Sequence, residues 1–169
     1  MTTHCLPPVA DKQSRILILG SMPGKESLRR QQYYGHRHNA FWKLMHALLR
    51  EPYVQDYQAR LDMLLKYGIA LWDVIKSCER KSSLDAHIRN PVVNDFGSFF
   101  AEHTKIAHVF FNGAKACDTF MRYAGREFAG LSFTRLGSTS PAHTVPFDER
   151  RKDWQRILPY LEGINHGSL

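Results

Sequence analysis

The sequence predicts an α/β protein with three layers, in which a four-stranded parallel sheet lies between two layers of helices. Short runs of β-branched and leucine residues alternate along the chain with segments whose apolar residues recur at helical spacing. This alternation is typical of a parallel sheet covered on both faces. The 169 residues, 43% of them hydrophobic, suffice for one continuous core. We therefore expect a single domain over residues 15–169, preceded by a loose leader over residues 1–14.

Four segments have the composition of buried strands. The first, RILILG at residues 15–20, ends in glycine, as expected where a parallel strand runs into a loop. The other three are short runs rich in β-branched, leucine or aromatic residues, at 68–74, 105–111 and 131–137. Helices are predicted between and after the strands, at residues 39–50, 57–66, 94–103, 114–123 and 147–161. The functional loops of such a sheet gather at the carboxyl ends of its strands.

Charge and cysteine content limit the classes of function. Lys and Arg total 23 against 16 Asp and Glu, and the formal charge of +7 suits a polyanionic partner such as nucleic acid or an anionic membrane surface. Cys5, Cys78 and Cys117 lie far apart, which predicts neither a disulfide framework nor a clustered metal site. The first residues hold no signal-peptide core, and no apolar run is long enough to span a membrane. We expect a soluble, cytoplasmic protein without a bound metal.

The loop after the first predicted strand is the most informative segment. Its letters GSMPGK, residues 20–25, resemble a phosphate-binding P-loop, but that motif needs four residues between its glycines and a Ser or Thr after the lysine. Here three residues separate the glycines, and Glu26 follows Lys25. A carboxylate there would repel a triphosphate instead of holding its magnesium ion. The sequence therefore argues against a nucleotidase.

The same loop combines cations with aromatic rings. Basic residues at positions 25, 29, 30 and 37 are interleaved with the aromatic residues Tyr33, Tyr34, Phe41 and Trp42. Basic groups can grip phosphates while an aromatic face stacks on a base. A second interpretation is structural: the arginines form a solvated face, Phe41 and Trp42 belong to the core, and Asn39 caps the following helix. Capping and catalysis are compatible at Asn39.

Several motifs occur in order along most of the chain. They are GSMPG from Gly20, YYGHxxNxFW from Tyr33, GIALWDV from Gly68, FNG from Phe111 and STSPAHT from Ser138. Together they resemble the deoxyinosine (hypoxanthine) branch of the uracil-DNA glycosylase superfamily. The resemblance implies a four-stranded parallel sheet and an enzyme of base excision repair. Such an enzyme hydrolyses the N-glycosidic bond of a deaminated base in DNA, leaves an abasic site and needs no cofactor.

The resemblance assigns the catalytic role to Asn39. Related branches carry Asp or Asn at the third position of the first motif to orient water, whereas this chain has Met22, whose thioether cannot polarise water. Met22 is expected to border the bound base instead. Asn39 is only weakly basic, which suffices where cleavage passes through an oxocarbenium-like state that electrostatics can stabilise. Relatives lack a Schiff-base lysine, so we expect monofunctional cleavage, although Lys25 lies in this loop.

Three further residues are implied to bind the extruded base. Tyr34 matches the aromatic position that stacks on the base in related branches. Asp73 falls where uracil-specific enzymes carry an asparagine that reads the base edge, and its carboxylate can accept the N1–H of hypoxanthine. Asn112, after the third strand, competes for that role. The structural alternatives are an N-cap for Asp73 and a turn residue for Asn112.

The last motif is implied to grip DNA. Ser140 is expected to contact phosphate, and Pro141 and Ala142 to form the wedge near the emptied base stack. Ser138 departs from other branches, which carry a catalytic histidine or an asparagine there, and it is placed with His143 among the DNA contacts. Lys25 and Arg37 complete the set. Segment 78–89 also resembles the family, and its basic and serine residues either reach phosphate or are simply solvated.

Three functions remain in competition. The first is hydrolysis of hypoxanthine from DNA, the second is a uracil or mismatch-uracil glycosylase, and the third is a catalytically inert DNA-binding relative. The expected partner is double-stranded DNA with a deaminated base, and single-stranded DNA is a second candidate. The protein is expected to act as a monomer, away from membranes, in the cytoplasm, associated with the nucleoid if the source is prokaryotic.

Overall fold

The central sheet is the feature on which the rest of the molecule is built. The computed structural model describes residues 2–125 and 128–161. Its four parallel strands pair in the order β3-β2-β6-β7. Their bounds are Ile16–Gly20 for β2, Ile69–Asp73 for β3, His108–Asn112 for β6 and Ser132–Leu136 for β7. The predicted four-stranded parallel sheet is confirmed.

Burial along β2 shows that both faces of this sheet are covered. All five residues of the strand are buried, as expected for a strand in the middle of a parallel sheet. Ile16 and Ile18 belong to one hydrophobic cluster, whereas Leu17 and Leu19 belong to a second cluster on the opposite face. Because successive side chains of a strand point to opposite faces, one strand contributes to both cores.

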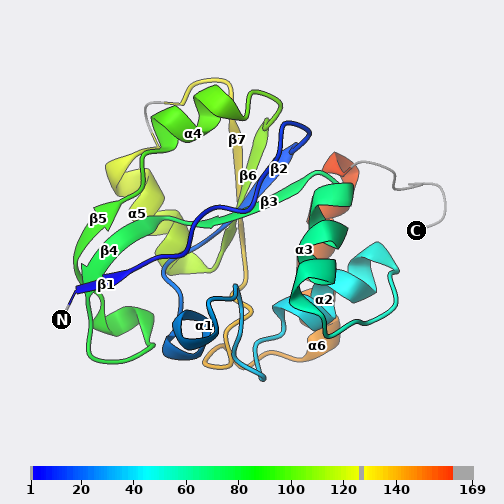
Figure 1. Ribbon diagram of the computed structural model, residues 1–169, viewed down its shortest axis with the longest axis horizontal. Helices are drawn as coiled ribbons and strands as arrows, with labels where there is room; N and C mark the ends of the chain where they lie inside the picture. The colour runs from blue at the N-terminus through cyan, green and yellow to red at the C-terminus, as the bar shows by residue number, and fades with distance from the viewer. Residues whose placement is uncertain (1, 126–127, 162–169) are drawn as a thin grey trace.

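The helices form the two outer layers of the predicted three-layer architecture. Figure 1 shows α2, α3 and α6 on one side of the sheet and α4 and α5 on the other. The bounds are Phe41–Leu49 for α2, Tyr57–Lys66 for α3, Phe96–Glu102 for α4, Ala114–Tyr123 for α5 and Phe147–Trp154 for α6. The helix predicted at 147–161 divides in the structure, because a 3₁₀ helix over Gln155–Tyr160, η2, follows α6 and contains Pro159.

The strand order fixes where functional loops meet. The chain passes from β2 to β3 on one side and then crosses back to β6 on the other side of β2. In such an open parallel sheet, ligands bind beyond the carboxyl ends of the strands at the point where the order reverses. All four strands run in the same direction, so the loops after β2, β3, β6 and β7 lie at one edge, near α1 in Figure 1.

The N-terminal segment is packed against the domain, so the prediction of a loose leader over 1–14 is wrong. Thr2–His4 forms strand β1, which pairs antiparallel with β4, Ile75–Glu79. Leu6 is only 4% exposed, and the Tyr33 hydroxyl donates a hydrogen bond to the Pro7 carbonyl oxygen at 2.6 Å. Single buried residues separated by prolines show no periodicity, which is why the pattern was not visible in the sequence. Residues 162–169 of the predicted domain lie outside the described residues.

A second sheet was also not predicted. Strands β1, β4 and β5, the last over Arg89–Val93, form a three-stranded antiparallel sheet beside the main one. Strand β5 contains Pro91, and proline is tolerated there because β5 is an edge strand. Helix α1, Lys25–Arg30, was likewise expected to be loop, and the Glu26 carboxylate accepts hydrogen bonds from Arg29 and Arg30 on its surface. Neither segment has the long apolar pattern that marks an element in a sequence.

The packing of the N-terminal segment can be tested by unfolding. We expect Leu6→Ala to lower the free energy of unfolding by about 2–4 kcal/mol, because it removes a fully packed side chain and leaves a cavity. Urea unfolding followed by circular dichroism measures the change. Val92→Ala is the matched control, since Val92 is 55% exposed and its truncation should change the value by less than about 0.5 kcal/mol. Equal stability of both variants would mean that the segment does not pack as described.

Candidate active site and nucleic-acid interface

A cavity of about 720 Å³ lies at the carboxyl ends of the four parallel strands. The last residue of each strand lines the cavity, namely Gly20 of β2, Asp73 of β3, Asn112 of β6 and Leu136 of β7. The loops that follow β2 and β7 and the segment 83–85 complete its wall. Of the twelve residues predicted for the site, all except Arg37 line this cavity. The sheet therefore brings together side chains that are more than a hundred positions apart.

Glycine at the end of β2 makes room for the carboxylate at the end of β3. Gly20 pairs with Asp73 in the parallel register, and a Cβ atom on Gly20 would lie 2.6 Å from Asp73 Oδ1 and 3.4 Å from the Tyr34 hydroxyl. The first distance is far shorter than a van der Waals contact. Met22, two residues on, is buried and packs with the cluster beneath α5. Its thioether side chain presents an apolar wall to the cavity.

Asp73 is a carboxylic acid buried without a partner for its second oxygen. The side chain is 4% exposed, and Oδ2 is fully buried with no hydrogen bond within the described residues. Burial raises the pKa of Asp73 to about 7, while the nearby Arg80 lowers it and Asp85 raises it further. Asp73 caps no helix, because strand β4 begins two residues later, so the N-cap interpretation is wrong. An unsatisfied buried acceptor of this kind is suited to a ligand that donates a hydrogen bond.

Asn112 is held by Thr139 through two hydrogen bonds. Its Nδ2 donates to Thr139 Oγ1 at 2.9 Å, and its Oδ1 accepts from the Thr139 backbone N–H at 2.9 Å. Both residues are buried. The carboxamide therefore joins the end of β6 to the loop after β7, and its best-placed donor and acceptor are already in use. This geometry favours Asp73 over Asn112 as the residue that meets a base edge.

Tyr34 adopts a left-handed backbone and places its ring against the core. Its φ is 54°, which is uncommon for a residue that is not glycine. One face of the ring stacks on Phe41 with 4.0 Å between ring centroids and 26° between planes. The hydroxyl is buried and makes no hydrogen bond of normal geometry among the described residues. Burial and the Asp73 carboxylate raise its pKa, and the nearby Asn112 side chain lowers it. Tyr33 also borders the cavity, but it is buried and its hydroxyl donates a hydrogen bond to the Pro7 carbonyl oxygen.

Asn39 lies at the mouth of the cavity and also starts α2. Its Oδ1 accepts a hydrogen bond from the Phe41 backbone N–H at 2.9 Å, which supports the first turn of α2. The residue at the N-cap position is Ala40, so the N-cap interpretation of Asn39 is off by one residue. The backbone N–H of Ala40 donates to the Thr139 carbonyl oxygen at 3.1 Å, which ties this segment to the loop after β7. The side-chain amide group of Asn39 has no hydrogen bond to the described protein and lies beside the cavity.

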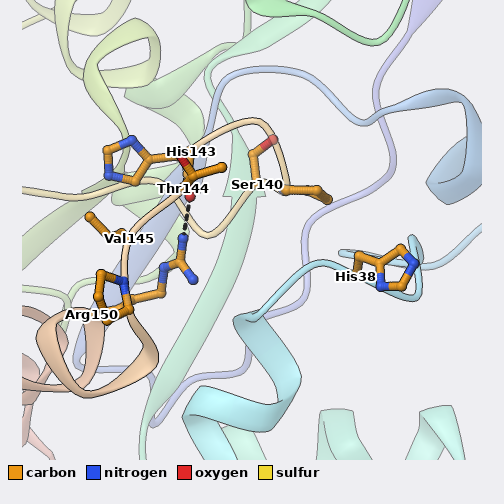
Figure 2. Close-up of a pocket in the computed structure, with 8 residues that line it drawn as sticks. His38, Ser140, His143, Thr144, Val145 and Arg150 are labelled. Carbon is orange, nitrogen blue, oxygen red and sulfur yellow. Dashed lines mark hydrogen bonds between the residues drawn. The ribbon is translucent and has the colours of Figure 1, made fainter.

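The loop from Ser138 to His143 forms the rim. Ser138 Oγ accepts a hydrogen bond from the Ser140 N–H at 3.1 Å, and Ser140 Oγ accepts one from the Ala142 N–H at 3.2 Å. These two turns leave Pro141, Ala142 and His143 exposed. Figure 2 shows residues that line a second, open hollow, with Ser140 and His143 of the rim on one side and His38 on the other. There the Arg150 guanidinium donates to the His143 carbonyl oxygen at 2.6 Å and holds the end of the loop.

The two predicted cations lie differently. Lys25 is exposed and lines the cavity, and its backbone N–H donates to Ser83 Oγ at 2.9 Å. Arg37 is exposed but lies outside the cavity lining, where its Nε donates to His38 Nε2 at 3.0 Å. Arg37 is therefore placed on the surface next to the second hollow rather than in the cavity.

Sequence reasoning missed several residues of the site. Thr139 was not singled out although it lies in the last motif, and Ser21 and Asp85 were not connected although Ser21 Oγ donates to Asp85 Oδ1 at 2.6 Å. Arg80 was expected either to reach phosphate or to be solvated, whereas its guanidinium donates to the Pro23 carbonyl oxygen and has a buried Nη1 without a partner among the described residues. The family motif at 78–89 was the one signal that could have pointed to this side of the cavity.

Neither a membrane span nor a metal cluster occurs in the part of the chain that the structure describes. Within residues 2–125 and 128–161, no helix is both long enough and apolar enough to cross a bilayer. Over the same residues, no three His, Cys, Asp or Glu side chains lie close enough together to hold a metal ion. Cys5, Cys78 and Cys117 are all unpaired thiols.

Comparison with known proteins agrees with the fold and the cavity. The family model of the uracil DNA glycosylase superfamily matches residues 7–162. A protein named hypoxanthine DNA glycosylase from Methanosarcina barkeri is 36% identical over 157 residues, which cover 91% of this chain and 96% of the relative. A protein of the same name from Methanosarcina acetivorans is 36% identical over 159 residues, covering 94% and 99%. The chain belongs to the uracil DNA glycosylase superfamily.

A solved structure has the same architecture. The solution NMR structure of a candidate uracil DNA glycosylase from Methanosarcina acetivorans superposes with a TM-score of 0.81 at 34% sequence identity. The match covers 93% of this chain and 96% of the other. The resemblance inferred from the motifs is therefore confirmed at the level of the superfamily.

Burial of the Asp73 carboxyl group predicts a gain in stability on its removal. The carboxyl group loses its proton near pH 4 in the unfolded chain but near pH 7 in the folded protein, so ionisation of the folded state costs stability as the pH rises between these values. We expect Asp73→Asn to raise the free energy of unfolding, by an amount that grows from about pH 4 to pH 7 and reaches at most about 4 kcal/mol.

Urea unfolding of both proteins at pH 4, 6 and 8 measures this gain. Asp118→Asn is the matched control, because Asp118 is exposed on α5 and its loss should give no such pH-dependent gain. A gain for Asp73→Asn that is the same at all three pH values would contradict the burial of an unpaired carboxyl group.

Proposed function

We propose that this protein is a DNA glycosylase that hydrolyses the N-glycosidic bond of hypoxanthine in DNA and leaves an abasic site. Membership of the superfamily and the names of the two Methanosarcina relatives support the class of reaction and the base. The observation that carries the proposal is the Asp73 carboxylate, buried beside the cavity with an unpartnered oxygen. A neutral base with an N–H on its edge supplies the missing donor.

Base selection follows from the hydrogen-bonding pattern of the edge. Hypoxanthine carries a hydrogen on N1, which the ionised Asp73 carboxylate can accept, whereas the N1 of adenine is an acceptor that the carboxylate repels. Tyr34, supported from behind by Phe41, is the aromatic surface available for stacking, typically worth about 1–3 kcal/mol per base. Met22 closes the cavity with an apolar wall. Uracil also has an N–H on its edge and is the second candidate substrate.

The reaction breaks the bond between C1′ and N9, whose electron pair departs with the base. The oxygen of a water molecule then bonds to C1′, and its proton is released to the base or to solvent. In this proposal Asn39 orients the water by accepting a hydrogen bond from it at the second lone pair of Oδ1, whose other lone pair accepts the Phe41 N–H. A weak base suffices because the sugar becomes cationic before the water attacks, and neighbouring phosphates stabilise that charge.

The expected substrate form is a duplex from which the base is extruded. The cavity opens between the Ser138–His143 rim and Lys25, and the chain carries a formal charge of +7. The protein is proposed to act as a monomer on DNA in the cytoplasm. These features complete the proposal of a monofunctional repair hydrolase that works without a cofactor.

The catalytic role of Asn39 is tested by base release under enzyme excess. Fluorescently labelled duplexes carrying hypoxanthine, uracil or no lesion are incubated with the protein and treated with alkali, which cleaves abasic sites. We expect release at hypoxanthine, and a rate about 10²–10³-fold lower for Asn39→Ala, the range seen when one polar group of an active site is removed. Gln58→Ala, on the exposed surface of α3, is the control amide and should keep the wild-type rate.

Other outcomes would point to the competing functions. Faster release of uracil than of hypoxanthine would make the protein a uracil glycosylase. Tight binding to the hypoxanthine duplex without release of either base would identify an inert binder. A covalent adduct trapped with borohydride would refute monofunctional cleavage and direct attention to Lys25, the lysine of the first loop that lines the cavity.

The protonation state of Asp73 predicts a dependence of rate on pH. The ionised carboxylate accepts the N1–H of hypoxanthine much more strongly than the protonated acid does, and burial raises the pKa of Asp73 to about 7. We therefore expect the single-turnover rate to fall about tenfold from pH 8 to pH 6 in the wild type. In Asp73→Asn the carbonyl oxygen still accepts the N1–H, so this fall should disappear. A rate that instead rises as the pH drops would mean that protonated Asp73 donates to the base.

A further inference from the structure

An exposed leucine lies at the cavity on the side away from the last motif. Leu84 is 48% exposed and lines the cavity. Six other large apolar side chains are exposed in the described part of the chain, and none of them lines the cavity. They are Tyr53, Val54, Val92, Met121, Tyr123 and Tyr160. Because Leu84 is half exposed and borders the cavity, its side chain is available to contact an apolar group of a molecule that binds there.

The backbone around Leu84 is fixed by side-chain hydrogen bonds. On one side, Ser83 Oγ accepts from the Lys25 N–H at 2.9 Å, which ties this loop to the start of α1. The Leu84 N–H donates to Ser82 Oγ at 3.1 Å. On the other side, Asp85 Oδ1 accepts from Ser21 Oγ at 2.6 Å, which ties it to the loop after β2. The backbone that carries Leu84 is thus anchored on both sides of the residue.

Leu84 and the last motif approach the cavity from opposite edges of the main sheet. The segment of Leu84 follows β4, which continues from the edge strand β3, whereas Pro141 and Ala142 follow the other edge strand, β7. Pro141 and Ala142 are small, and Leu84 has a longer apolar side chain. Exposed Lys81 lies three residues before Leu84, where it can meet a phosphate. Apolar side chains beside cations are the means by which proteins enter and unstack duplex DNA.

We propose that Leu84 is a second DNA wedge, which enters the base stack beside the extruded base and works opposite Pro141 and Ala142. This proposal rests on the function proposed above. The side chain substitutes for stacking lost when the base leaves, so it favours the extruded state over the stacked state. It is needed only where a stacked duplex must be opened. Removing it should therefore slow the reaction on paired DNA and leave the reaction on unpaired DNA unchanged.

The test compares Leu84→Ala with wild type on two DNAs of the same sequence. One is a duplex with paired hypoxanthine, and the other places hypoxanthine in an unpaired internal loop. We expect single-turnover base release to fall at least tenfold on the duplex and less than twofold on the loop. Leu84→Met should restore duplex activity, because it keeps an apolar side chain of similar length. Val92→Ala is the control, since Val92 is exposed and lies outside the cavity lining.

A binding measurement separates failure of this inference from failure of the proposed function. A 2-aminopurine placed next to hypoxanthine brightens when the neighbouring base leaves the stack, whether or not the glycosidic bond is cleaved. If wild type brightens the probe and Leu84→Ala does not, the wedge is supported even when no base is released. Equal brightening, or equal rates on the duplex, for Leu84→Ala and wild type would overturn it. Leu84 is exposed, so the variant is expected to keep the wild-type melting temperature.

Discussion

The paired hydrogen bonds between Asn112 and Thr139 hold the functional end of the molecule together. They join the end of β6 to the loop after β7, and the Thr139 carbonyl oxygen also accepts from Ala40 at the start of α2. Three segments that are distant in sequence thereby meet at one buried threonine. Buried polar groups that are fully satisfied specify a single arrangement, since any displacement would leave them without partners. Asn39 and the rim at Ser138–His143 take their positions from this link.

The same hydrogen bonds distinguish the two residues that could bind the base edge, Asp73 and Asn112. Because the Asn112 carboxamide is committed to Thr139, the polar group left unsatisfied at the end of a strand is Asp73. Keeping that carboxyl group buried raises its pKa and destabilises the folded protein when it ionises. Gly20 is the second half of the arrangement, because any larger residue would occupy the space of Asp73 Oδ1. The buried Asp73 carboxyl group therefore lowers the stability of the folded protein, as is common at sites where a bound ligand supplies the missing partner.

The sequence predicted the main sheet well because β2, β3 and β6 are buried on both faces and appear as continuous apolar runs. It failed for β1, β4 and β5, because β1 and β5 contain no fully buried residue and the two buried residues of β4 are three positions apart, so none of them shows a strand pattern in the sequence. The motifs located nearly all of the residues that line the cavity, yet they could not show which were already engaged. The hydrogen bond between Asn112 and Thr139 and the strand that follows Asp73 depend on tertiary structure, so the motifs could not reveal them. Leu84 escaped notice because its exposure at the cavity depends on three segments.

The internal bonds of the rim also bear on how DNA would be held. Ser138 and Ser140 each use a hydroxyl oxygen to accept a backbone N–H. A hydroxyl that accepts in this way keeps its own hydrogen to donate, so both serines remain donors toward the cavity, where a phosphate oxygen can accept. Their orientation is set before any DNA arrives, which lowers the entropy lost on binding. The hydroxyl groups of Ser138 and Ser140 on the β7 side, and Leu84 with its anchored backbone on the β3 side, would together fix the register of a duplex over Asp73.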